Sequence, residues 1–361
     1  MEILAAHPTI IVDIGTETIK IGYANDEFPK HVTNTKDFVN QFTSPFNKGK
    51  ISSISKYCQL LIYSLKQFDR SIFSSSQLSN FYSLVICLKE TDFNNIEVRN
   101  NCEKILHHVF GNYQGFRSPF NSLFFANSHV CDLFGSSKTT GLVCSLSSFF
   151  SATGIVDGLI KKHENCDYGA LELTKNIFHI FKDKISDYVN SKFKNESDDI
   201  KKFRMLELAR QIKEEAFYFY SQNIADNIDF EYEINNSFKI KVLKEDIKEL
   251  IIKVIADSVA LIKKVIEKID NEDKNVLLSN IVLTGGMANM YIAEKIEGCL
   301  IDIYPENRIK VFCEKDTFHT FLGASVLGSL GDAKSLFISN MDYGAYGANI
   351  LERKKFNWAV E

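Results

Sequence analysis

The sequence predicts an α/β protein made of two similar halves, with a helical insertion in the second half. Residues 9–24 and residues 139–160 each contain an apolar strand, a short polar turn and a second strand. Strand patterns alternate with helical spacing along the rest of the chain, which is typical of layered α/β folds. We therefore expect two α/β halves that face each other across a cleft.

The first half begins with "TIIVDIGTETIKIGYA" at 9–24, an apolar strand followed by a bend at Gly15 and Thr16. Polar and apolar residues alternate after the bend, which indicates a second strand and hence a hairpin. Polar atoms are therefore expected at the bend of the hairpin. Residues 34–50, which follow the hairpin, include a proline and a glycine and predict a short exposed subdomain between strands.

A short strand and an amphipathic helix follow in the first half. The stretch "YSLVICL" at 82–88 is a short apolar strand, as expected for a buried sheet. Residues 98–113 have the spacing of a helix with one apolar face. The apolar positions of that face are Val98, Cys102, Ile105, Leu106 and Val109.

The second half repeats the hairpin and adds helices. Residues 139–160, "TTGLVCSLSSFFSATGIVDGLI", give a buried strand, a polar turn and a second strand. Residues 174–220 and 243–270 are mainly amphipathic helix. The charged run at 190–202 lacks apolar periodicity and is interpreted as a surface loop or helix edge. We expect these helices to form an insertion at about 173–269.

The composition of the chain limits the classes of protein to which it can belong. The chain has 361 residues, 45% hydrophobic and 24% charged, which favours two domain-sized units. Its 42 Lys and Arg are scattered against 46 Asp and Glu, so direct nucleic-acid binding is not expected. No run of eighteen apolar residues predicts a membrane span, and no signal peptide is recognisable, so we expect an intracellular protein.

The eight cysteines do not form a metal or disulfide pattern. They lack a C-x-x-C pair and histidines at ligand spacing, which argues against a zinc site and a disulfide framework. We expect reduced thiols that pack as small apolar side chains.

A glycine pair follows an apolar strand in "NIVLTGGMANMY" at 280–291. Without a Cβ, Gly285 and Gly286 would allow a flat ring or a phosphate to approach the backbone. An ordinary tight turn between strand and helix gives the same pattern. The glycine pair does not by itself indicate a nucleotide site.

The motifs taken together resemble the actin and actin-related protein family. The blocks that carry the resemblance are, in chain order, "VDIGTETIKIGYA", "KTTGLVCSLSSFFSATGIVDG", "ARQIKEEAFYF", "NIVLTGGMANMY", "FLGASVLGSL" and "LFISNMDYGAYGANILERKKF". The family has two ribonuclease-H-type domains with ATP and a divalent metal in the cleft. The resemblance implies a first domain at 1–135 plus 325–361 and a second at 136–324. It also implies a reduced second subdomain at about 33–74.

The resemblance also implies a set of nucleotide-binding residues. The first phosphate loop corresponds to Asp13, Gly15, Thr16 and Lys20. The pair beside the ribose and adenine corresponds to Lys213 and Glu214, and the adenosine loop corresponds to Gly285, Gly286 and Met287. These blocks support a purine pocket and a phosphate-facing hairpin.

The second phosphate loop departs from the family pattern. Actins have Asp-Ser-Gly-Asp-Gly there, whereas this chain has Ser145, Leu146, Ser147, Ser148 and Phe149. The family holds its metal through carboxylates and their bound waters, and a serine hydroxyl carries no charge for that purpose. We also expect the rings of Phe149 and Phe150 to occupy the space of a terminal phosphate or to pack it shut. The sequence therefore predicts no tightly bound metal and, at most, weak binding of ATP or ADP.

The residues that orient the attacking water in the family are replaced as well. The glutamine position is Ser128, and the histidine position lies near Ala152. His129 is interpreted as a packed, hydrogen-bonded core residue rather than a substitute. Hydrolysis of ATP needs an oriented water beside a polarised phosphate, so we expect no catalytic residues.

The resemblance leaves several functions open. The short segment between Thr33 and Lys50 and the retained C-terminal blocks favour a cytoplasmic, cytoskeletal subunit that caps the pointed end of a short actin-like filament, as in dynactin. Its partners would be filament subunits and other proteins of a large assembly. The alternatives are a nuclear subunit of a chromatin-remodelling complex, a lineage-specific actin-like protein, and an active ATPase of the wider hexokinase superfamily.

Overall fold

The computed structural model describes residues 8–35, 45–47, 50–73, 81–89, 91, 95–111, 118–222, 230–235, 238–313 and 318–354. The chain divides into two compact units. The first comprises Met1–Val143, Thr153–Lys162 and Asp316–Glu361, and the second comprises Cys144–Ala152 and His163–Lys315. These units differ from the expected domains at 136–143, 153–162 and 316–324.

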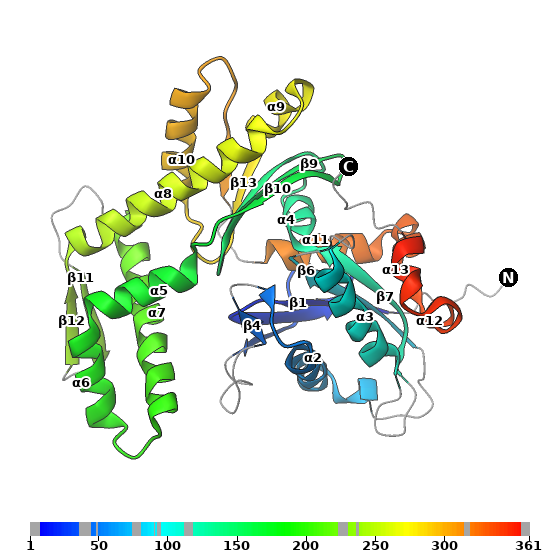
Figure 1. The fold of residues 1–361 in the computed structure, drawn as a ribbon, viewed down its shortest axis with the longest axis horizontal. Helices are drawn as coiled ribbons and strands as arrows, with labels where there is room; N and C mark the ends of the chain where they lie inside the picture. The colour runs from blue at the N-terminus through cyan, green and yellow to red at the C-terminus, as the bar shows by residue number, and fades with distance from the viewer. Residues whose placement is uncertain are drawn as a thin grey trace. The chain divides into compact units, whose positions relative to one another are not determined.

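The first unit is built on a six-stranded sheet with strand order β15-β7-β6-β1-β2-β3 (Figure 1). Its strands are β1 (Thr9–Ile14), β2 (Thr18–Tyr23), β3 (His31–Asn34), β6 (Tyr82–Leu88), β7 (Phe120–Asn127) and β15 (Ile338–Ser339). Strand β1 is antiparallel to β2 and parallel to β6, and β6 is parallel to β7. The central strands are apolar and almost fully buried, as a sheet covered on both faces requires.

Helices cover the sheet of the first unit. They are α2 (Ile54–Phe68), α3 (Ile96–Phe110), α4 (Ser128–Gly135), α11 (His319–Ser329), α12 (Asn340–Tyr346) and α13 (Ile350–Arg353). Helices α4 and α11 approach so closely that a Cβ on Gly323 would lie 1.8 Å from the carbonyl oxygen of Cys131. This packing against α4 explains why α11 belongs to the first unit, although residues up to 324 were expected in the second.

The second unit contains the helical insertion. Its helices are α5 (Ala170–Ile180), α6 (Lys182–Lys192), α7 (Asp198–Gln222), α8 (Lys244–Glu267), α9 (Asn271–Leu278) and α10 (Met290–Ile303). The five-stranded sheet has the order β10-β9-β8-β13-β14, and β11 and β12 form a separate hairpin. These strands are β8 (Gly141–Leu146), β9 (Phe150–Val156), β10 (Leu159–Asn165), β11 (Phe230–Asn235), β12 (Phe238–Val242), β13 (Ile281–Thr284) and β14 (Val311–Cys313).

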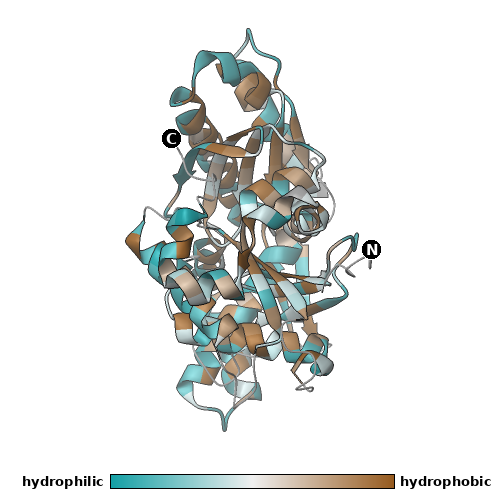
Figure 2. Cartoon of the chain, turned by 90° about the vertical axis from the view of Figure 1, so that its right-hand side faces the viewer, coloured by the Kyte–Doolittle hydropathy of each residue, from teal (hydrophilic) through white to brown (hydrophobic). Residues whose placement is uncertain are grey.

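The structure confirms the main elements that the sequence predicts. Both hairpins and the strand at 82–88 are present, and the helix predicted at 98–113 is observed as α3 at Ile96–Phe110. In Figure 2 hydrophobic residues colour most of the strands, whereas the helices alternate between hydrophobic and hydrophilic. The predicted subdomain at 34–50 falls largely outside the described residues, which here include only the short pair β4 (Phe46–Asn47) and β5 (Lys50–Ile51).

The cysteines are free thiols, as expected, but three of the eight are not buried: Cys166 and Cys313 are half-buried and Cys299 is exposed. All eight are free, and five of them are buried. Cys299 on α10 is exposed, and it lies beside the buried stripe of that helix. Within the described residues, no helix is both long and apolar enough to cross a membrane.

Candidate functional site

The first predicted loop lies at the end of the β1–β2 hairpin. Asp13 and Lys20 are directly opposite each other in the antiparallel register, and both are buried. The Nζ atom of Lys20 donates a hydrogen bond to Oδ2 of Asp13 at 3.2 Å. The bend is closed by the N–H of Gly15, which donates to the carbonyl of Thr18 at 2.9 Å, and Thr16 lies half-buried at the bend. The four predicted residues are therefore adjacent in the first unit.

Two further charged residues lie near this hairpin and were not anticipated from the sequence. Lys89 follows β6, and Asp132 lies in α4. Burial lowers the pKa of Lys89, and the carboxylates of Asp132 and Asp13 partly oppose this shift by favouring its charged form. We call Asp13, Lys20, Lys89 and Asp132 the charge cluster. No sequence motif marks Lys89 or Asp132, because their proximity depends on tertiary packing.

The replaced second loop, residues 145–149, joins β8 to β9 in the second unit and is called the serine turn. Ser145 Oγ donates to Ser147 Oγ at 3.3 Å, and Ser147 Oγ donates to the carbonyl of Phe149 at 3.2 Å. Ser145 and Ser148 are buried. The hydroxyls of Ser145 and Ser147 thus bond within the turn, and the turn contains no carboxylate.

Two loops of the second unit close around the serine turn. On one side, the N–H of Ala170 donates to the carbonyl of Ser147 at 3.0 Å. A Cβ on the neighbouring Gly169 would lie 2.3 Å from the carbonyl oxygen of Ser148. On the other side, the N–H of Met287 donates to the carbonyl of Leu146 at 3.1 Å. The predicted adenosine loop and the serine turn therefore form one packed structure.

The two glycines of the adenosine loop have different surroundings. Gly285 has φ of +97°, and a Cβ there would lie 2.6 Å from the carbonyl carbon of Leu146. Gly286 has no described atom within 4 Å of the place where its Cβ would be. Gly285 is therefore required by the fold, whereas Gly286 is exposed and a side chain there would meet no described atom.

One expectation about the serine turn is wrong. Phe150 was expected to fill the space of a terminal phosphate, but it is fully buried at the start of β9. Its ring packs edge-on against Tyr168 with centroids 6.1 Å apart. Strand alternation turns this ring into the core, and only Phe149 remains half-buried at the turn.

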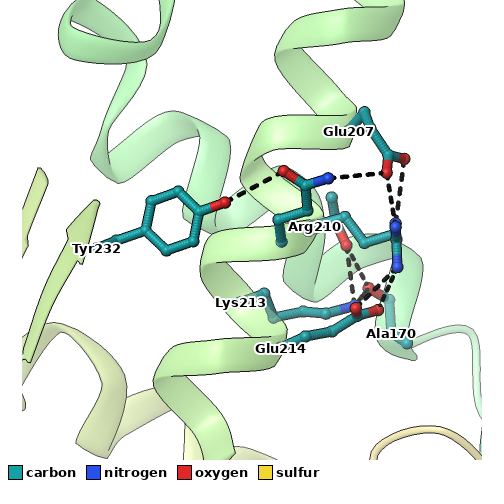
Figure 3. A network of polar contacts seen from close by, with 8 residues as sticks. Ala170, Glu207, Arg210, Lys213, Glu214 and Tyr232 are labelled. Atoms are coloured by element: carbon teal, nitrogen blue, oxygen red, sulfur yellow. Dashed lines mark hydrogen bonds and ion pairs between the residues drawn. The ribbon is translucent and has the colours of Figure 1, made fainter. Parts of the chain in front are cut away.

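Lys213 and Glu214 take part in a polar network on α7 (Figure 3). Lys213 is buried, and its Nζ donates to the carbonyl of Ala170 at 3.1 Å and to Thr174 Oγ1 at 3.0 Å. Glu214 accepts from Nη1 of Arg210 at 2.6 and 2.8 Å. Lys213 therefore holds the start of α5, which in turn contacts the serine turn through Ala170.

The same network extends from Arg210 to β11. Arg210 donates to both carboxylate oxygens of Glu207, at 3.1 and 2.6 Å. Gln211 donates to Glu207 at 3.5 Å and accepts from the hydroxyl of Tyr232 at 3.1 Å. The hydrogen bond with Glu207 is the main reason why the pKa of Arg210 is raised above its ordinary value. The network thus ties α7 to the β11–β12 hairpin.

The residues at the positions that orient an attacking water in the actin family are packed in the interior of this chain. Ser128 is the first residue of α4 and is buried. His129 is buried and hydrogen-bonded through Nδ1 to Thr153 Oγ1 at 3.3 Å, which confirms it as a core residue. Ala152 is fully buried in β9.

A divalent metal of the kind implied by the fold family does not fit these residues. Such ions need several carboxylate or carbonyl oxygens. Across the described ranges, no three His, Cys, Asp or Glu residues are grouped so that they could hold a metal ion. Asp13 is already paired with Lys20, and the serine turn offers only hydroxyls and backbone.

Comparisons with known proteins match part of the chain. Residues 245–356 match the family model of actin. Actin-related protein 4 of Emericella nidulans is 29% identical over 99 residues, which are 26% of this chain and 21% of the relative. The Arabidopsis thaliana protein of that name is 32% identical over 100 residues, 26% of this chain and 23% of the relative.

A third relative gives the same result. Actin-related protein 4 of Neurospora crassa is 31% identical over 100 residues, 26% of this chain and 21% of the relative. The chain thus spans about a fifth of the length of the relatives it matches. The family match includes Gly285, Gly286 and Met287, but it does not reach the first hairpin or the serine turn. The chain is thus similar to the actin family model at residues 245–356 and to these actin-related proteins over about 26% of its length.

Proposed function

We propose that this chain is a non-catalytic actin-related subunit of a multiprotein assembly. The serine turn is the observation that carries the proposal. The hydroxyls of Ser145 and Ser147 bond within the turn, and two loops close around it at residues 169–170 and 285–287. A turn of this kind holds the fold together and supplies neither metal ligands nor a polarised phosphate site.

The proposal includes weak binding of ATP or ADP without a tightly held metal. Support comes from the open space beside Gly286 and from the Asp13–Lys20 hairpin, each within its own unit. Lys213 and Glu214, expected beside the ribose and adenine, form hydrogen bonds with Ala170 and Arg210. A nucleotide that took these side chains as its own partners would have to replace those hydrogen bonds, which favours weak binding.

The specific form that we propose is a cap on the pointed end of a short actin-like filament in the cytoplasm. The C-terminal blocks, which in the family build the opposite end of the subunit, fall within the actin match at 245–356. The short segment at 33–50, the second basis of this proposal, lies largely outside the described residues. A subunit with one competent end would join a filament once and stop its growth.

The alternative is a nuclear subunit of a chromatin-remodelling complex. The three relatives are each named as an actin-related protein and not as actin itself. That name is compatible with a filament cap and with a chromatin-remodelling subunit, so we retain both functions as proposals. Both forms require a folded, non-catalytic chain with a retained C-terminal face.

Native purification tests the proposal. The chain would be tagged at its chromosomal locus, the lysate separated by sedimentation, and the co-migrating proteins identified by mass spectrometry. We expect a large stoichiometric complex that contains actin-like filament subunits. A complex with a chromatin ATPase would support the alternative, and a free species near 41.1 kDa, the mass of the chain, would contradict both forms.

A further inference from the structure

A loop of the second unit, residues 166–170, lies against the serine turn and the start of β9, and we call it the covering loop. The N–H of Phe150 donates to the carbonyl of Tyr168 at 3.0 Å, and the N–H of Cys166 donates to the carbonyl of Phe150 at 2.9 Å. The N–H of Ala170 donates to the serine turn as well. Displacement of the covering loop would break these three backbone hydrogen bonds and expose the turn.

The side chain of Tyr168 makes three contacts from the covering loop. Its ring packs edge-on against Phe150 with centroids 6.1 Å apart, and its hydroxyl accepts from Nδ2 of Asn176 on α5 at 3.2 Å. The Nζ atom of Lys253, on α8, lies over the ring at 4.3 Å from its centroid. Tyr168 thus connects the covering loop to β9, α5 and α8.

A carboxylate of the same helix pairs with Lys253. Its Nζ atom lies 3.4 Å from Oδ2 of Asp257, one turn further along α8. That oxygen is buried and has no hydrogen bond within the described part of the chain, so the ammonium group compensates its charge. The negative face of an aromatic ring also attracts a cation. The ammonium group of Lys253 therefore lies between two groups that it stabilises, Asp257 and the ring of Tyr168.

We propose that Lys253 holds the covering loop closed over the serine turn, so that loss of its positive charge allows the loop to open. Helix α8 gives the cation a fixed support, because Ile251 and Val254 beside it are buried in the core. The loop fits in one position only, since a Cβ on Gly169 would lie 2.3 Å from the carbonyl oxygen of Ser148. This conformational role goes beyond the assembly function proposed above and does not depend on it.

Hydrogen–deuterium exchange of the purified full-length chain tests the proposal. Mass spectrometry would follow the peptides that contain residues 145–150 and 166–170. Lys253→Gln keeps a long polar side chain but removes the charge. We expect both segments to exchange about three- to tenfold faster than in the wild-type chain, because the closed loop loses a contact between cation and ring. Lys253→Arg should exchange like the wild-type chain, since a guanidinium group also stacks on aromatic rings.

Lys263→Gln is the matched control on the same helix. Lys263 pairs with Glu267 at 3.6 Å, again one turn further along, and its side chain is 50% exposed, compared with 48% for Lys253. Exchange at the covering loop should not change in this variant. Tyr168→Leu removes the ring instead of the cation and should also accelerate exchange. In that background Lys253→Gln should add less than about twofold, because the contact between the two residues is already lost.

Three outcomes would overturn the proposal. They are unchanged exchange at the covering loop in Lys253→Gln, an equal acceleration in Lys263→Gln, and full multiplication of the effects of Lys253→Gln and Tyr168→Leu in the double variant. If Tyr168→Leu does not fold, the comparison of the two glutamine variants decides. The assembly role is tested by co-purification, so the two proposals can fail separately.

Discussion

At the scale of single residues, the charged side chains of α7 contribute to the fold more than to an open site. Arg210 bridges two carboxylates of its own helix, Glu207 and Glu214, and its side chain is largely buried. Because the raised pKa of Arg210 keeps it charged at all accessible pH values, the carboxylates keep their partner. Glu214, a family ribose contact by position, therefore has a structural partner in this chain.

Replacing Arg210 should destabilise the second unit. Arg210→Met keeps the volume of the side chain but leaves Glu207, which is largely buried, without its bidentate donor. A hydrogen bond to a charged group contributes about 1.5–3 kcal/mol, so we expect the free energy of unfolding to fall by about that amount. Urea denaturation followed by circular dichroism would measure the change.

Arg204→Met is the control for that experiment. Arg204 also forms a bidentate pair from α7, with Glu196, but its side chain is more exposed. Exposed ion pairs contribute little, because water screens them. An equal decrease in the free energy of unfolding in the two variants would show that burial does not make the Arg210 network more stabilising than an exposed ion pair.

At the scale of elements, the sequence identified the hairpins but not what packs against their turns. The strand at 141–146 and its partner at 150–156 follow from apolar patterning. The closure of the serine turn by Gly169, Ala170 and Met287 depends on contacts between distant segments, which no local pattern encodes. For the same reason Phe150 was assigned to the turn, although it belongs to the core.

Gly285→Ala tests whether the adenosine loop is structural. The residue has φ of +97°, and an added Cβ would meet the backbone of Leu146 at 2.6 Å. Disfavoured backbone conformations cost on the order of 1–3 kcal/mol, and the backbone clash adds to this. We expect the free energy of unfolding, measured by urea denaturation, to fall by at least that amount.

The neighbouring Gly286→Ala provides the comparison, since no described atom lies within 4 Å of its Cβ position. Its stability should stay within about 0.5 kcal/mol of the wild-type value, as for substitutions away from packed features. If Gly286→Ala were the more destabilising of the two, the assignment of Gly285 as the structural glycine would be wrong.

At the scale of the whole molecule, the order of motifs was enough to recognise the family and the α/β class. The boundaries between the two units were harder to predict from the sequence, because they depend on packing. Helix α11 joins the first unit through its contact with α4, and the arms of the second hairpin divide between the units. The charge cluster was missed for a similar reason: Lys89 and Asp132 carry no motif, and only the fold places them near Asp13.

The final prediction concerns catalysis by the complete chain. Wild-type protein should release no phosphate from magnesium ATP above background. The double variant Ser145→Asp, Ser148→Asp should not gain activity, because Ser128 still occupies the position of the water-orienting glutamine and Phe149 still lies at the turn. Both serines are buried, so the new carboxylates would also be poorly compensated, at a cost of about 3–5 kcal/mol for such a charge. Stability and phosphate release would therefore be measured together. If the double variant unfolds, the wild-type assay alone decides: magnesium-dependent release that is abolished by Asp13→Ala would show that the chain is an active ATPase.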